Sequence, residues 1–133
     1  MTLNNPKGCL GYAAEFQSSA LPWVTSSRAP IAGSPVRFDF PKVSRFITLS
    51  NIGAGGTISL GFTRNGVISG NKFVLLQSQS VSFEVRVRQV WLQGEVGTPE
   101  FSLFAGLTNI DANNMPELSG TLANGDPGWT GIG

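Results

Sequence analysis

Apolar and polar residues alternate along residues 80–88, which read SVSFEVRVR. Valine and phenylalanine occupy the odd positions, and serine, glutamate and arginine occupy the even ones. Because successive side chains of a β-strand point to opposite faces, this pattern predicts a strand with one buried face and one solvated or docked face. The alternation falters near Arg88, where we expect a kink before QVWLQG continues the strand.

Several other stretches between residues 35 and 108 have the same character. VRFDF and TISLGFT alternate, and RFITLSNI is more evenly apolar, as a largely buried strand would be. GAGG at residues 53–56 predicts a tight turn, with a hairpin as the simplest form, and Asn65-Gly66 predicts a β-hairpin. Turn signals at intervals of roughly eight to twelve residues are typical of a sandwich or barrel. We therefore predict an all-β fold over residues 35–108: an antiparallel β-sandwich or a small, jelly-roll-like β-barrel.

In residues 1–34 and 109–133, neither the alternation of a strand nor the spacing of an amphipathic helix continues for long. We expect an extended N-terminal arm and an extended C-terminal tail. Burying one large apolar side chain is worth about 1.5–3 kcal/mol, so aromatic residues in such segments should lie against a surface. That surface is either the chain's own sheet or a neighbouring subunit; a sheet unit of about 74 residues is marginally stable alone, which favours the neighbour. The predicted anchors are Tyr12, Phe16, Leu21, Trp23, Val24 and Trp129.

Charge is scarce and unevenly placed. Charged residues make up 13% of the chain, and the formal net charge of +1 argues against a nucleic-acid-binding protein. Seven basic residues lie between Arg37 and Arg88, whereas five acidic residues and no basic ones follow Arg88. The basic middle and the acidic end could pair within one chain or between neighbours, or the charges could simply be solvated.

The residue types needed for common catalysis are missing. The chain has no histidine, and its single cysteine, Cys9, can form neither an internal disulfide nor a metal site with a second cysteine. GAGG lacks the Lys-Ser/Thr ending of a phosphate-binding loop. We expect no enzymatic activity, no catalytic residue, no metal and no cofactor. Neither a secretory signal nor a membrane-spanning run is recognisable, so we expect a soluble protein made in a cytoplasm, with no membrane partner.

The tryptophans and the arginines each suggest a binding hypothesis. Tryptophans could form a platform on which a sugar stacks, and arginines on neighbouring strands could contact single-stranded nucleic acid. A structural or subunit-facing role is the simpler interpretation of both sets. The residues concerned are Trp23, Trp91 and Trp129 for the first hypothesis, and Arg37, Arg45, Arg86 and Arg88 for the second.

The arm AEFQSSALPWVTSS, the run FITLSNIGAGGTISLGFTRNGV, the strand SVSFEVRVRQVWL and the late FSLFAGLTNI together cover most of the chain. In these stretches the chain resembles the small head-decoration (cement) proteins and related minor structural proteins of tailed phages. The resemblance implies a location on the exterior of a virion capsid and no catalysis. It also implies partners in the major capsid protein and in copies of the chain itself, as a homotrimer or other homo-oligomer.

In such a protein the arms would bridge neighbouring capsid subunits, with Arg86 and Arg88 as polar partners of an adjoining subunit. Two alternatives stay open. One is a receptor-binding or carbohydrate-binding β module of a tail or knob. The other is a coat protein that assembles its own shell.

Overall fold

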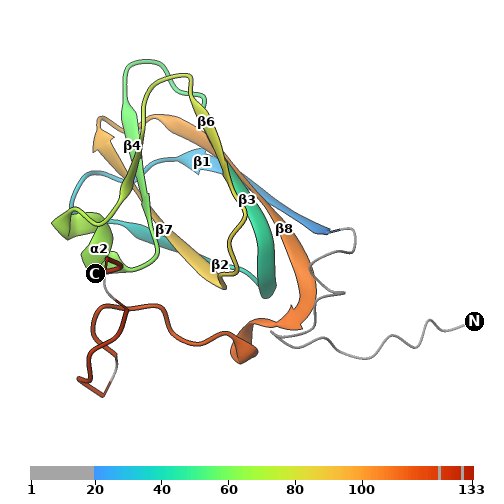
Figure 1. Cartoon of the computed structure of the whole chain (residues 1–133). Helices are drawn as coiled ribbons and strands as arrows, with labels where there is room; N and C mark the ends of the chain where they lie inside the picture. The colour runs from blue at the N-terminus through green and yellow to red at the C-terminus, as the bar shows by residue number, and fades with distance from the viewer. Residues whose placement is uncertain (1–19, 123, 130) are drawn as a thin grey trace, which may run out of the picture.

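The computed structural model describes residues 20–122, 124–129 and 131–133, and these form two antiparallel four-stranded sheets packed face to face (Figure 1). Sheet A has the strand order β1 (Leu21–Arg28), β8 (Glu100–Asp111), β3 (Lys42–Asn51) and β6 (Ser80–Phe83). Sheet B has the order β2 (Val36–Asp39), β7 (Gln89–Val96), β4 (Thr57–Gly61) and β5 (Phe73–Leu75). The predicted all-β sandwich is confirmed.

The strand pairing is nested. β1 pairs with β8, β2 with β7, β3 with β6 and β4 with β5, all antiparallel. This is the connectivity of one long antiparallel hairpin that has been rolled up into two sheets, which is the double Greek-key order of a jelly roll. β1 and β2 therefore lie at one edge of the sandwich, and β5 and β6 lie at the other.

The core lies between the two sheets. It is built from alternate residues of the central strands, such as Leu49 on β3, Ile58 on β4 and Leu103 on β8, all of which are fully buried. Since these residues stand at the inward positions of a period-two pattern, burial of apolar surface fixes the register of each strand.

The predicted alternation of inward and outward side chains over residues 80–88 is confirmed, but the strand itself, β6, ends at Phe83 and does not continue to Arg88 as predicted. Val87 is buried and Val81, Phe83 and Val85 pack against the core, whereas the even-numbered residues from Ser82 to Arg86 are exposed. Regular pairing within sheet A ends at Phe83, and residues 84–88 then cross to sheet B. Ser44 secures this crossing, because its backbone N–H donates to the Val87 carbonyl at 2.9 Å and its hydroxyl donates to the Val85 carbonyl at 2.6 Å.

The sheets begin earlier in the chain than predicted. Leu21, Trp23 and Val24 are not part of an extended arm but belong to β1, which pairs with β8 along all eight of its residues. Trp23 packs edge to face on Phe40 of the same chain, with ring centroids 4.9 Å apart. Pro22 does not prevent the strand because β1 is an edge strand, where a missing N–H on the outer side costs nothing. Of the other predicted N-terminal anchors, Tyr12 and Phe16 lie outside the described residues.

The predicted hairpin at Asn65-Gly66 is wrong. Residues Arg64–Ser69 form a short helix, α2. Thr63 caps its N-terminus by accepting a hydrogen bond from the Gly66 N–H at 2.9 Å, and Gly70 ends it with a φ of 114°. The capping pair overrides the turn preference of Asn-Gly. GAGG does form a turn, with Gly55 at a φ of 79°, but it links β3 of sheet A to β4 of sheet B and is therefore not a hairpin.

β8 runs to Asp111, three residues past the predicted end of the sheet domain, and a 3₁₀ turn at Ala112–Asn114 follows it. The described residues after this turn form no helix or strand and carry one isolated bridge, between Thr121 and Pro127. This segment runs across one end of the sandwich and reaches α2, where the Thr63 hydroxyl donates to the Ile132 carbonyl at 2.7 Å (Figure 1).

Candidate functional site: an apolar face at the open edge

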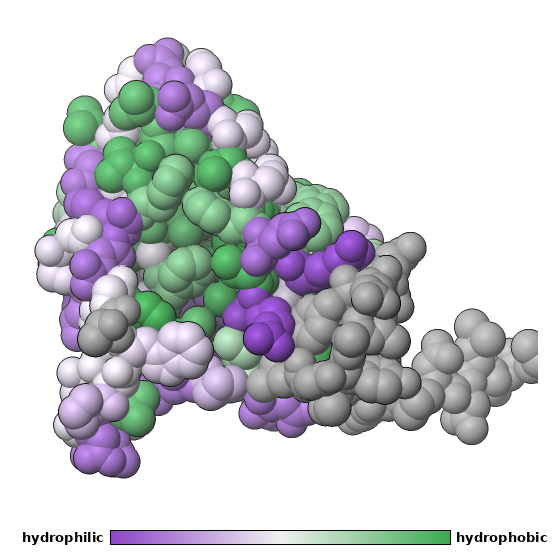
Figure 2. Space-filling view, viewed as in Figure 1, coloured by the Kyte–Doolittle hydropathy of each residue, from purple (hydrophilic) through white to green (hydrophobic). Residues whose placement is uncertain are grey.

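Apolar side chains gather where the two sheets are left open between β5 and β6, and Figure 2 shows them as one continuous area facing the viewer. The rings of Phe73 on β5 and Phe83 on β6 meet edge to face across this opening. We call this surface the open-edge face and define it by Phe62, Phe73, Val81, Phe83 and Val85. Phe73 is 45% exposed, and the other four residues are half-buried.

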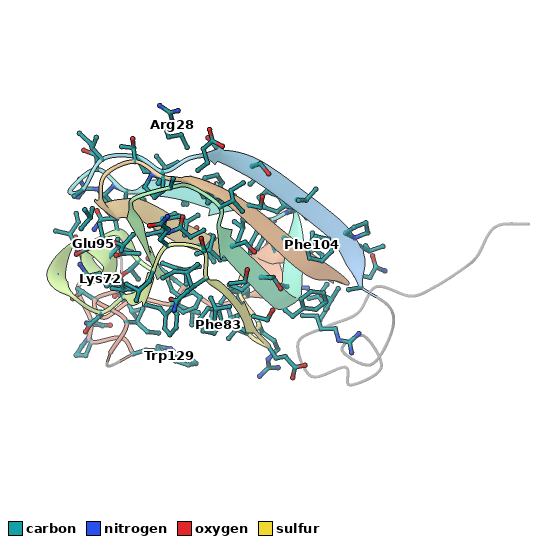
Figure 3. All side chains as sticks on the ribbon, turned by 90° about the horizontal axis from the view of Figure 1, so that it is seen from above. Arg28, Lys72, Phe83, Glu95, Phe104 and Trp129 are labelled. Carbon is teal, nitrogen blue, oxygen red and sulfur yellow. The ribbon has the colours of Figure 1, made fainter. Side chains whose placement is uncertain are left out.

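A groove of about 600 Å³ continues the open-edge face toward the C-terminal segment. Phe62 and Val85 line one side of it, and Met115, Leu118 and Trp129 line the other. Trp129 is 56% exposed and lies on the same side of the molecule as Phe83 in the view from above (Figure 3). An exposed apolar area of this kind on a folded chain is a candidate site of contact with another molecule.

The two predicted polar contact residues lie on the crossing segment. Arg86 is exposed and lines the groove. Arg88 is half-buried; its carbonyl accepts a hydrogen bond from the Phe40 N–H at 2.8 Å, and its side chain lies in the wall of a small cavity beside Glu117. Arg86 is thus next to the apolar groove, whereas the backbone of Arg88 continues the pairing of β2 with β7 beyond Asp39 and Gln89.

Of the other predicted anchors, Trp129 lines the groove but Leu21, Trp23 and Val24 lie on β1 at the opposite edge of the sandwich. Leu21 and Val24 are 49% and 65% exposed. Trp23 is half-buried and packs against the core of its own chain.

The outer face of sheet A carries hydroxyl groups that pair across strands. The hydroxyl oxygens of Ser50 and Ser80 lie 2.7 Å apart, as do those of Thr48 and Ser82. Ser26 and Ser102 are separated by 3.0 Å in the same way. Sequence reasoning missed this face, although serine or threonine recurs at the outward positions of all four strands.

A polar network ties the outer face of sheet B together around Glu95. Its carboxylate accepts hydrogen bonds from the Lys72 ammonium, from the Ser59 hydroxyl at 2.6 Å and from the Gln93 amide at 3.3 Å. The hydrogen bond from Lys72, followed by that from Ser59, lowers the pKa of Glu95 below its ordinary value near 4.5. The network joins β4, β7 and the residue before β5.

Part of the charge asymmetry of the sequence is resolved within one chain. Lys42 pairs with Asp111 at 2.6 Å, and Lys72 pairs with Glu95. Two basic residues of the middle region therefore pair with acidic residues of the end region. Pairing within one chain was one of the possibilities left open by the sequence.

Among the described residues, no three histidine, cysteine, aspartate or glutamate side chains come together as a metal site would require. No helix in the same residues has the length and apolar character needed to cross a membrane. Cys9 lies outside the described part of the chain.

Comparison with known proteins gives no family assignment. No protein-family model matches the sequence, and no curated protein is significantly similar to it.

Proposed function

We propose that this protein is a non-enzymatic structural subunit of a virus particle, which binds neighbouring shell subunits on the capsid exterior and holds them together. The observation that carries the proposal is the open-edge face with its groove, an apolar surface on a chain of low charge. Jelly rolls occur in viral capsid and lectin domains, so the fold supports the virion location by analogy alone.

The chemistry of the groove favours a protein partner. Aromatic residues and methionine are enriched in the buried centres of protein interfaces, and a few of them supply most of the binding energy. Trp129 and Phe73 have the exposure and size for this role, and Met115 and Leu118 add an adaptable apolar wall to the groove. Arg86 at the rim would hydrogen-bond an acidic or carbonyl group of the partner.

A bridging role needs a second contact surface. The exposed Leu21 and Val24 lie on β1, at the edge of the sandwich opposite the open-edge face, and residues 1–19 with Tyr12 and Phe16 precede that strand. A subunit that binds one neighbour through the groove and another through the β1 edge would resist their separation. Each contact can be weak, because two linked contacts act together.

Co-sedimentation with viral shells that lack the protein tests the proposal. The wild-type protein should bind saturably, and Trp129→Ala should weaken binding by about tenfold or more, as expected for an interface anchor. The matched control is Val96→Ala at the end of β7, because Val96 is 61% exposed and lies outside the groove. Equal binding by the two variants would contradict the assignment of the groove.

The isolated protein also distinguishes this proposal from the coat-protein alternative. A shell-attached subunit should remain a monomer or small oligomer in light scattering at concentrations at which it binds preformed shells. Spontaneous assembly of the purified protein into closed particles would contradict the proposal in favour of a coat protein. Absence of any binding to shells would contradict both the groove and the bridging role.

A further inference from the structure

A second depression, of about 360 Å³, lies on the outer face of sheet B. Its walls come from β2, β7, the start of α2 and the C-terminal segment, whose last residues reach α2 in Figure 1. Its volume falls within the range of about 300–1,000 Å³ typical of small-molecule sites. The larger side chains that line it include Arg37, Arg64, Asn65, Gln89, Trp91 and Glu117.

Trp91 provides an aromatic wall for this pocket. Its neighbours on β7, Val90 and Leu92, are fully buried, so the alternation of the strand directs Trp91 to the outer face. On β4, the residue paired with Trp91 is Gly61, which has no side chain to cover the indole ring. Val67 of α2 packs over Gly61 instead, and the helix thereby stands beside the ring as the pocket wall. The indole is left half-buried, with part of it open to the pocket.

Hydrogen-bond donors and hydrogen-bond acceptors surround the indole ring of Trp91. Arg37 is paired with Trp91 across the strands and uses its Nε to donate to Asp39 at 3.0 Å, which leaves its terminal N–H groups for another acceptor. Arg64 is exposed, and its guanidinium makes no hydrogen bond or ion pair within the described part of the chain. Glu117 adds a carboxylate, which accepts hydrogen bonds only.

This combination matches a sugar better than a simple anion. The C–H face of a pyranose ring packs on the negative face of an indole, and each sugar hydroxyl both donates and accepts hydrogen bonds. Guanidinium donors, the amides of Asn65 and Gln89 and one carboxylate acceptor satisfy that mixture. A small anion would meet the repulsion of Glu117, and Asp39 already neutralises part of the charge on Arg37.

We propose that the Trp91 pocket binds a saccharide, with the sugar ring stacked on the indole and its hydroxyl groups held by Arg37, Arg64 and Glu117. The site and the apolar groove share Leu118 as a wall, but Trp91 lines only the first and Trp129 lines only the second. Saccharide binding is therefore a function separate from attachment to a shell, and either can fail without the other.

Saturation-transfer NMR on the full-length protein tests the proposal. The probes are glucose, galactose, mannose, N-acetylglucosamine, glucuronic acid and sialyllactose, each titrated to a concentration on the order of 10 mM. At least one should bind, and Trp91→Ala should weaken that binding by about tenfold or more, with Arg64→Ala weakening it less. Trp91→Phe keeps an aromatic surface and should retain most of the affinity, and Trp129→Ala should bind as the wild-type protein does.

Sodium phosphate and sodium acetate serve as the anion probes. Binding of either anion at the same site with an affinity equal to that of the best sugar would overturn the saccharide assignment, and so would the absence of binding by all six sugars. Equal sugar binding by Trp91→Ala and wild type, with an unchanged circular dichroism spectrum, would place the site elsewhere and also overturn the proposal.

Discussion

Phe73 on β5 and Phe83 on β6 pack edge to face, with ring centroids 5.2 Å apart and an interplanar angle of 86°. The two strands belong to different sheets, so this aromatic contact joins the sheets at the edge where no backbone pairing does. Edge-to-face packing places the positive rim of one ring against the negative face of the other. The same pair forms the centre of the open-edge face.

Truncation of Phe83 should destabilise the sandwich. Replacement of a buried phenylalanine by alanine costs about 3–5 kcal/mol, and because Phe83 is half-buried we expect Phe83→Ala to lower the free energy of unfolding by about 2 kcal/mol. Urea denaturation measures the change. The nearby and more exposed Leu76 is the control, and Leu76→Ala should cost less than about 0.5 kcal/mol. Similar costs for both variants would show that the aromatic contact does not hold the edge together.

The cap of α2 should be measurable. Thr63→Ala removes the oxygen that accepts from Gly66 and that donates to Ile132, so we expect a loss of about 1–2 kcal/mol in unfolding free energy. Gly66→Ala should cost more, because a Cβ at this position collides with the Ile132 carbonyl oxygen. Ser69→Ala is the control: its exposed hydroxyl bonds only within the helix, to the Asn65 carbonyl. We expect the loss of stability to increase from Ser69→Ala through Thr63→Ala to Gly66→Ala. The reverse order of losses in thermal melts would contradict this expectation.

The Glu95 network predicts a dependence of stability on pH. Since hydrogen bonds lower the pKa of Glu95 in the folded state, its carboxylate stabilises the fold fully above the unfolded pKa near 4.5. That contribution is lost as the pH falls from this value through the lower folded pKa. Glu95→Gln should therefore be less stable than wild type by about 1–2 kcal/mol at pH 7 and should approach wild type in acid.

Urea unfolding of both proteins between pH 7 and pH 2 measures this difference. Glu100→Gln provides a control, because its ion pair with Arg28 is long, at 3.8 Å, and exposed, and should contribute less than about 0.5 kcal/mol. A difference between Glu95→Gln and wild type that stays constant with pH would contradict the role of the carboxylate charge.

Removal of N-terminal residues should separate the sandwich from the segment before it. Deletion of residues 1–19 leaves β1 intact, so the shortened chain should still unfold cooperatively and keep its near-UV circular dichroism. Deletion of residues 1–28 also removes β1 and exposes β8 and the ring of Phe40, and this chain should be unfolded or aggregated. An unfolded product from the shorter deletion would mean that residues 1–19 belong to the core.

Period-two alternation predicted the strands that bury one whole face. It identified the inward-facing residues of 80–88, although only Ser80–Phe83 is a strand, and it identified Ile58, Leu60 and Phe62. A slip of one residue at these places would turn the apolar side chains toward solvent. β1 escaped this reasoning because it is an edge strand in which most side chains are exposed, so its sequence carries little amphipathic pattern. Its partner, β8, lies at the far end of the sheet domain, beyond the reach of local signals.

The helix and the groove were missed for different reasons. Asn65-Gly66 is a strong turn signal taken alone, but Thr63 and Gly70 frame the six residues between them as a capped helix, and attention to both caps would have found α2. The groove brings Val85 together with Met115 and Trp129, which only the return path of the C-terminal segment makes neighbours. The outward direction of Arg86, by contrast, followed directly from alternation.

The nested pairing of β1 with β8 has a consequence for how the chain is made. Leu21 pairs with Leu107, so sheet A cannot be completed until the chain as far as Leu107 has left the ribosome. Such distant pairing makes folding slow, because a long loop must close before its contacts form. Until then β1 has no strand to pair with, and during this interval the nascent chain is most prone to associate with other molecules incorrectly.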